Sequence, residues 1–192
     1  MSLLRHGAAG LRLLLVLTVL LGVGYPLVIT GVAFALPFQA GGSLLSRDGH
    51  VVGSDLLGQQ FDGPGWFHSR PSAAGDGYDA LSSGGSNLGP SNPDLVTAIN
   101  ERRQAIAAEE GVPSSEVPAD AVTASASGLD PHISVEYAAL QVARVARERG
   151  VDAAAVEQLV AANTEGPALG FLGRPRVNVV RLNLAVEALA GE

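Results

Sequence analysis

The sequence contains no cysteine. Disulfide bonds, a thiolate nucleophile, iron–sulfur clusters and cysteine-ligated zinc are therefore excluded. The absence leaves the redox compartment open, because a cysteine-free chain folds equally well on either side of a membrane.

Lysine is also absent, and all 12 basic residues are arginines. A Walker A loop, a Schiff-base enzyme and a lysine general base each require that side chain, so these three chemistries are excluded as well. The 19 acidic residues give a formal net charge of −7, which argues against a nucleic-acid partner.

Charged residues are scarce, at 16% of the 192 residues, whereas about 25% is typical of a soluble domain. They are also unevenly placed. Arg5 and Arg12 lie near the N-terminus, the first acidic residue is Asp48, and residues 13–38 carry no charge. This uncharged run is longer than the roughly 20 residues that a helix needs to cross a bilayer. It predicts that part of the chain is buried in lipid.

We therefore expect a single transmembrane helix over residues 13–38 of a protein of the cell membrane. The two N-terminal arginines predict that residues 1–12 stay in the cytoplasm and that residues 39–192 form one compact extracytoplasmic domain. The alternative is a cleaved signal peptide, since Ala33-Phe34-Ala35 resembles a cleavage site. The apolar run is too long for that, because signal sequences have apolar cores of about 7–15 residues.

The exported domain is predicted to be α/β, dominated by helices with a small β contribution from apolar pieces within residues 50–61. Residues 62–92 are rich in Gly, Ser, Pro and Asn and predict a long loop, which the aromatic residues Trp66 and Phe67 should hold in place. Cap residues predict four helices, which start after Asn92, Ser134, Asp152 and Asn178.

The second of these helices should place Val135, Ala138, Val142 and Val145 inward, because they recur at helical spacing. Arg144, Arg147 and Arg149 are then expected to project from its other side.

Ser125, Ser127, Asp130 and His132 lie within eight residues of one another and contain the residue types of a hydrolase triad. A triad needs groups that converge from separate elements, with the serine on a tight elbow such as G-x-S-x-G, and no such elbow is present. We expect a turn in which Ser and Asp side chains bind nearby backbone. Metal binding has no better support, because no third ligand is placed by spacing near Asp130 and His132.

The chain also resembles a known family over its whole length. The matching stretches are Tyr25-Pro26-Leu27, Gly58-Gln59 with Phe61, Phe67-His68, Arg70-Pro71-Ser72-Ala73, the segments 83–90 and 125–133, Gln141-Val142, Arg144-Val145-Ala146, Arg149-Gly150, Arg176-Val177-Asn178-Val179 and Leu182-Asn183. In this order they resemble the KdpC subunit of the Kdp potassium-transporting P-type ATPase. The candidate interface or motif residues are Tyr25, Pro26, Arg70, Pro71, Ser72, Ser86, Asn87, Ser125, Ser127, Gly128, Asp130, His132, Gln141, Arg144, Arg176, Asn178 and Asn183.

The resemblance implies an accessory subunit without catalysis of its own. Its partners would be a channel-like potassium-binding subunit and a P-type ATPase subunit that hydrolyses ATP. It also implies a proposed role as a catalytic chaperone, which raises the affinity of the ATPase subunit for ATP in a ternary complex. No cofactor is expected on this chain itself, and potassium is the transported ion. The alternative from another class is a membrane-tethered exported domain that binds a solute or acts as an enzyme alone.

Overall fold

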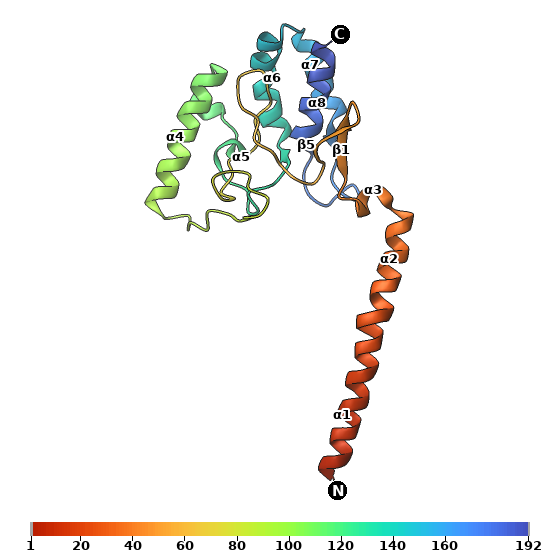
Figure 1. The fold of residues 1–192 in the computed structure, drawn as a ribbon. Helices are drawn as coiled ribbons and strands as arrows, with labels where there is room; N and C mark the ends of the chain where they lie inside the picture. The colour runs from red at the N-terminus through yellow and green to blue at the C-terminus, as the bar shows by residue number, and fades with distance from the viewer. Residues whose placement is uncertain (1, 192) are drawn as a thin grey trace. The chain divides into compact units, whose positions relative to one another are not determined.

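The computed structural model describes residues 2–191 and divides at Leu44 into two compact units. Just over half of the chain is helical, with small sheets, so the predicted helix-dominated α/β class is confirmed. The elements of each unit are coloured along the chain in Figure 1.

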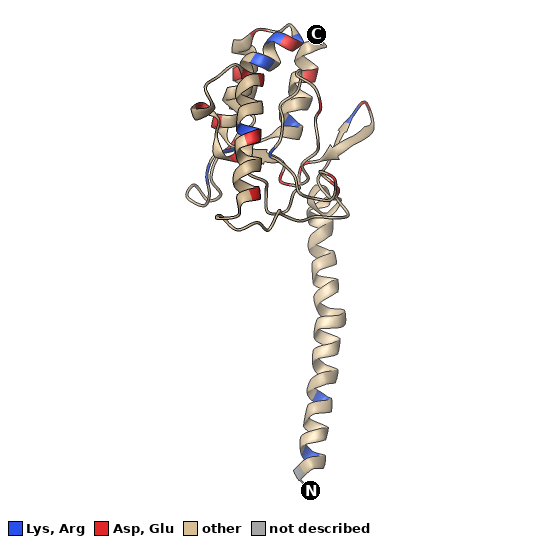
Figure 2. Cartoon of the chain, turned by 90° about the vertical axis from the view of Figure 1, so that its left-hand side faces the viewer, with Lys and Arg blue, Asp and Glu red and all other residues tan. Residues whose placement is uncertain are grey.

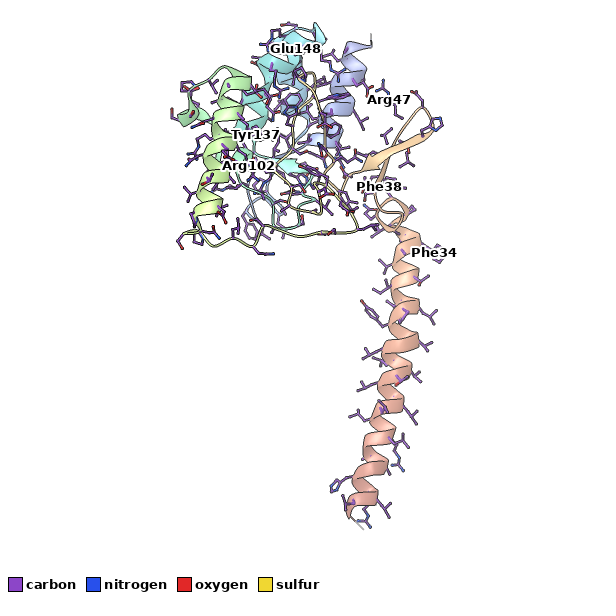
Figure 3. All side chains as sticks on the ribbon, turned by 60° about the vertical axis from the view of Figure 1, so that its left-hand side comes forward. Phe34, Phe38, Arg47, Arg102, Tyr137 and Glu148 are labelled. Atoms are coloured by element: carbon purple, nitrogen blue, oxygen red, sulfur yellow. The ribbon has the colours of Figure 1, made fainter. Side chains whose placement is uncertain are left out.

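The first unit is a long apolar helix. It consists of α1 (Ser2–Val19), a widened π-type turn η1 (Leu20–Gly24) and α2 (Tyr25–Ala35), and the short α3 (Pro37–Ala40) follows. Leu3–Ala35 is long and apolar enough to cross a membrane, and none of its most apolar stretch is buried. In Figure 3 the labelled side chain of Phe34 points outward from this helix. The helix ends at Ala35, before the predicted end of the span, because Pro37 disfavours the helical conformation at Leu36.

Charge is confined to one end of this helix. In Figure 2 it is tan except close to its start, where Arg5 and Arg12 lie. Because leucine and valine side chains are exposed all round it, the helix has no apolar partner in its own unit. Such a helix is buried either by lipid or by other helices.

The second unit begins with a hairpin of β1 (Leu44–Arg47) and β2 (His50–Ser54). Its turn is Asp48-Gly49, and both residues have positive φ, as a two-residue type I′ turn requires. The prediction placed strands only after His50 and missed β1. The Asp-Gly pair was the available signal, since this dipeptide between apolar residues is a strong hairpin indicator.

A second sheet was not predicted. Its strands are β3 (His132–Ile133), β4 (Thr164–Glu165) and β5 (Arg176–Asn178), in the antiparallel order β3-β5-β4. His132 lies opposite Asn178, and Glu165 lies opposite Arg176. Strands of two or three residues show too little alternation to be recognised from sequence.

The four predicted helices are present as α4 (Pro93–Glu110), α6 (Val135–Arg149), α7 (Ala153–Ala162) and α8 (Val179–Ala190), with the short η2 (Ser114–Glu116) and α5 (Ala119–Val122) between the first two. Each of the four has the predicted capping residue, whose side chain accepts a hydrogen bond from the first turn. The core forms where α6, α7 and α8 pack, and Tyr137, which is labelled in Figure 3, is one of its buried residues.

Candidate functional site: a clasped loop and a charged groove

The loop after β2 is held by two buried amide side chains. Asn183 of α8 accepts a hydrogen bond from the backbone N–H of Phe67 (2.8 Å) and donates one to its carbonyl (2.9 Å). Gln141 of α6 does the same for His68, at 2.7 and 3.2 Å. Each amide thus acts as a neighbouring strand would, and Phe67 becomes fully buried. We call residues 64–68 the clasped loop.

Arg144 completes the clasp from inside the protein. Its Nη1 donates to the carbonyls of Pro64 (2.6 Å) and Trp66 (2.9 Å), and its Nη2 donates to Oε1 of Gln141 (2.8 Å). Only 2% of its side chain is exposed. The prediction that Arg144 projects away from the inward side of α6 is therefore wrong. Helical spacing shows the angle of a side chain but not which loops fold over it.

Glu110 at the end of α4 neutralises this arginine. Its Oε1 lies 2.9 Å from Nε of Arg144, and its side chain is equally buried. Burial raises the pKa of the Glu110 carboxyl, and the charge of Arg144 opposes that rise. Nothing in the sequence pointed to Glu110, because its partner lies 34 residues away.

Arg149 holds the outer side of the same loop. Its Nε donates to the carbonyl of Gly65 (2.7 Å), and its guanidinium lies 3.9 Å from the centre of the Trp66 ring. The carbonyls of Pro64, Gly65, Trp66 and Phe67 thus all have side-chain partners. A loop without secondary structure is ordered because its backbone groups are satisfied in this way.

The segment 125–132 is a turn, as expected. The hydroxyl of Ser127 accepts from the N–H of Leu129 (3.1 Å), and Asp130 Oδ1 accepts from the N–H of His132 (3.0 Å). Within residues 2–191, neither Ser125 nor Ser127 has a hydrogen bond to the imidazole of His132. The arrangement is that of local backbone capping and not of a triad.

Gly128 allows this turn to approach a second loop closely. It has φ +68°, and a Cβ there would lie 2.7 Å from the backbone nitrogen of Ala74 and from the carbonyl of Gly84. Ser72 Oγ donates to the Gly128 carbonyl (2.6 Å), and the N–H of Ser125 donates to the carbonyl of Pro71 (3.3 Å). Motif residues far apart in the sequence are thereby brought together around one glycine.

Arg70 links the two loops through charge. Its Nη1 lies 3.3 Å from Asp130 Oδ2, and its Nη2 donates to the carbonyls of Thr123 and Ala124 at 3.4 Å. Burial alone would raise the pKa of Asp130, but hydrogen bonds from His132 and the nearby charges of His132 and Arg70 outweigh it, so this pKa is lowered. Arg70 thus pairs with a carboxylate inside the domain.

A groove of about 900 Å³ lies beside this bridge, between the start of α6 and the β3–β5 strands. Charged side chains of both signs line it, among them Arg70, Asp130, His132, Arg174 and Arg176.

The charges of the groove continue around its edge. His132 lies between two carboxylates, with Nδ1 3.4 Å from Asp130 and Nε2 3.9 Å from Glu165. Glu165 also pairs with Arg176 (2.9 Å) and with Arg181 (3.4 Å), and Arg181 pairs with Asp55. Glu165, Arg181 and Asp55 could not be recognised from the sequence as members of this network, because strands that could not be predicted bring them together.

The remaining motif residues lie elsewhere. Asn178 binds Asp55 through its amide nitrogen and caps α8 through its oxygen. Ser86 and Asn87 are exposed in the loop before α4, and Tyr25 and Pro26 belong to the first unit. In residues 2–191 no three His, Asp or Glu side chains are grouped so that they would hold a metal ion.

Comparison with known proteins gives consistent matches along the chain. The sequence model of the KdpC family, described as "K+-transporting ATPase, c chain", matches residues 8–188. A protein of Kineococcus radiotolerans named potassium-transporting ATPase KdpC subunit is 54% identical over 98% of this chain and 96% of its own length. Its namesakes in Nitratidesulfovibrio vulgaris and Mycobacterium tuberculosis are 56% and 52% identical, over 92% and 93% of this chain and 91% and 96% of their own lengths.

Proposed function

The chain belongs to the KdpC family of potassium-transporting ATPase subunits, and from this membership we propose that it is a non-catalytic accessory subunit of a high-affinity, ATP-driven potassium uptake complex. Its partners are a channel-like subunit that binds potassium and a P-type ATPase subunit that hydrolyses ATP. The observation that carries the proposal is the match over almost the full length of proteins that are themselves named as subunits of this ATPase.

In this proposal residues 1–12 are cytoplasmic, residues 13–38 span the cell membrane, and residues 39–192 form the extracytoplasmic domain. Two features support this orientation: the arginines at the start of the helix and the absence of charge over the rest of it. The cysteine-free chain makes the test simple, because an introduced cysteine is the only one present. Leu81 is 98% exposed, so Leu81→Cys should react with a membrane-impermeant maleimide in intact spheroplasts, whereas His6→Cys should react only after lysis.

The same labelling decides between two accessory roles. A chaperone that raises ATP affinity through a ternary complex needs its folded domain on the side where ATP is available. Labelling of Leu81→Cys from outside would contradict that role and favour a domain that stabilises the complex on its outer side. Labelling of Leu81→Cys only after lysis would favour the chaperone.

An acidic outer domain would also concentrate cations close to the transport path. Without Arg5 and Arg12 the chain carries 10 arginines and 19 acidic residues, and clustered negative charge raises the local concentration of cations. Glu101, Glu116 and Glu157 are exposed. Their replacement by Gln together should raise the apparent KM for potassium at low ionic strength, and the effect should fade at about 0.15 M salt. An unchanged KM at low salt would contradict enrichment.

The central test is the recovery of partners. A C-terminally tagged full chain, purified in mild detergent from native membranes after potassium starvation, should bring down a P-type ATPase and a channel-like subunit in stoichiometric amounts. If the chain is recovered alone, the accessory role is wrong, and the tethered domain that acts by itself becomes the better explanation.

A further inference from the structure

The loop between β4 and β5 is a rigid, apolar projection. In residues 166–175, Ala168 and Leu172 exchange two backbone hydrogen bonds of 2.9 Å, and the N–H of Gly170 donates to the carbonyl of Pro167 (3.0 Å). Leu169 is held at φ +54°, a conformation that costs a non-glycine residue roughly 1–2 kcal/mol. The segment is therefore a formed turn with a fixed shape. Figure 1 shows it in blue, leading into β5.

Its apolar side chains are half to mostly exposed in the part of the second unit that the structure describes. Leu169 is 83% exposed, Phe171 74% and Leu172 51%, and residues 166–173 include no charged side chain. A single exposed leucine needs no explanation, but three large apolar side chains within four residues form a patch of the kind that marks an interaction site. We call these three side chains the apolar tip.

A charged surface continues directly from this tip. Arg174 follows it in the chain, is exposed, and has no carboxylate within 4.0 Å among residues 2–191. Arg174 and Arg176 both line the 900 Å³ groove described above. The tip and the groove thus form one continuous surface, apolar at one end and charged at the other.

We propose that this surface docks onto the extracytoplasmic side of the channel-like potassium-binding subunit, with the apolar tip in an apolar recess and Arg174 opposite a carboxylate of that subunit. The proposal rests on the proposed function, since it requires a complex to dock into. A stable interface buries about 800 Å² on each partner, more than three side chains supply. The tip therefore acts as the buried anchor and the groove as part of the polar rim.

Charge and shape favour a protein partner over lipid or a second copy. A fluid bilayer adapts to the shape of whatever enters it, so binding to lipid does not require a strained turn. An anionic lipid surface would also repel a domain that carries a net charge of −9. Two copies packed by a twofold axis would present the same patch to each other. They would then bring the Arg174 of each copy, and two acidic domains, close together. A recess on another subunit brings only one acidic domain to the interface, and a carboxylate in that recess would face Arg174 directly.

The test is site-specific photocrosslinking of the full chain in cells that express the complex. Phe171→p-benzoylphenylalanine keeps an aromatic ring at the tip, and Leu81→p-benzoylphenylalanine is the control on an equally exposed site outside the patch. Position 171 should give a discrete crosslink to the channel-like potassium-binding subunit, identified by mass spectrometry, and position 81 should not. A crosslink from position 171 only to lipid, or only to a second copy, would overturn the proposal.

A second measurement uses affinity. Leu169→Ser, Phe171→Ser and Leu172→Ser combined should weaken retention of the chain on the partner subunits at least tenfold, whereas Leu81→Ser should leave it unchanged. The thermal midpoint should not move, because these side chains contribute little to the core. If the wild-type chain retains its partners and the triple variant does so equally well, the docking surface is wrong while the accessory function stands. If the wild-type chain itself retains none, the proposed function fails first.

Discussion

The clasp around Phe67 gives the most quantitative prediction, through the substitution Asn183→Ala. The amide of Asn183 satisfies both backbone groups of Phe67, at 2.8 and 2.9 Å, in a fully buried environment. Its removal leaves one N–H and one carbonyl without partners, and each such buried group costs about 1–3 kcal/mol. We expect a loss of about 2–5 kcal/mol, which is a large part of the roughly 5–15 kcal/mol that stabilises a typical domain.

The chain contains its own probe for this loss. Trp66 is the only tryptophan and lies next to Phe67 in the clasped loop, so its fluorescence reports the release of that loop. In a urea titration of the full chain in detergent, a slope of about 2 kcal/mol per molar converts the expected loss into a midpoint lower by about 1–2.5 M. Circular dichroism of the same samples shows whether the helices unfold with the loop or after it.

Asn163→Ala is the matched control. Asn163 donates one hydrogen bond, to the carbonyl of Leu159 at 2.8 Å, at the partly exposed end of α7. Its loss should cost less than about 1 kcal/mol, since a single hydrogen bond at a solvated site has a net value near that figure. If Asn183→Ala shifts the Trp66 midpoint no further than Asn163→Ala does, the amide does not hold the loop, and the account of the clasp is wrong.

Three further outcomes follow from the same contacts. Gly128→Ala should lower the thermal midpoint far more than Gly111→Ala does. Both glycines have φ near +70°, but a Cβ at Gly128 would meet three atoms at 2.7 Å, whereas a Cβ at Gly111 would lie in open space. Equal shifts of the two midpoints would show that the close approach at Gly128 is not real. Arg144→Met should lower the free energy of unfolding by about 3–5 kcal/mol, because it leaves the carboxylate of Glu110 buried without a cation. The double variant with Glu110→Gln should regain part of that loss in a double-mutant cycle measured by denaturation. Strictly additive effects of the two substitutions would argue against the ion pair. The folded-state pKa of Asp130 lies below its ordinary value of 3.8, so its charge stabilises the fold above 3.8 and this contribution is lost as the pH falls through the lowered pKa. Asp130→Asn should therefore be less stable than the wild type at pH 7, and the difference should shrink steadily as the pH is lowered below 3.8. A difference that stays constant down to the acid unfolding of the wild type would contradict this linkage.

The sequence predicted correctly those features that depend on interactions between residues a few positions apart in the chain. The caps Asn92, Ser134, Asp152 and Asn178 placed four helix starts, because a capping hydrogen bond involves only residues two or three positions apart. The turn at residues 125–132 was also recognisable, because its hydrogen bonds are local.

Long-range pairing was not accessible in this way. The partners Phe67 and Asn183 are 116 residues apart, and the strands that place His132 beside Glu165 are only two residues long. Arg144 shows the same limit most clearly: a charged residue on a helix is expected to face solvent, yet here an irregular loop covers it. The resemblance selected Arg144, Gln141 and Asn183 as motif residues, but the contacts by which they hold the clasped loop became visible only in three dimensions.

The widened turn at Leu20–Gly24 has a geometric consequence for the long helix. A π-type turn accommodates an extra residue, and one residue corresponds to about 100° of rotation in an α-helix with 3.6 residues per turn. A stripe of side chains that runs along α1 is therefore displaced sideways when it reaches α2. A straight neighbouring helix cannot follow a single stripe over the whole length, so α1 and α2 offer contact surfaces that point in different directions.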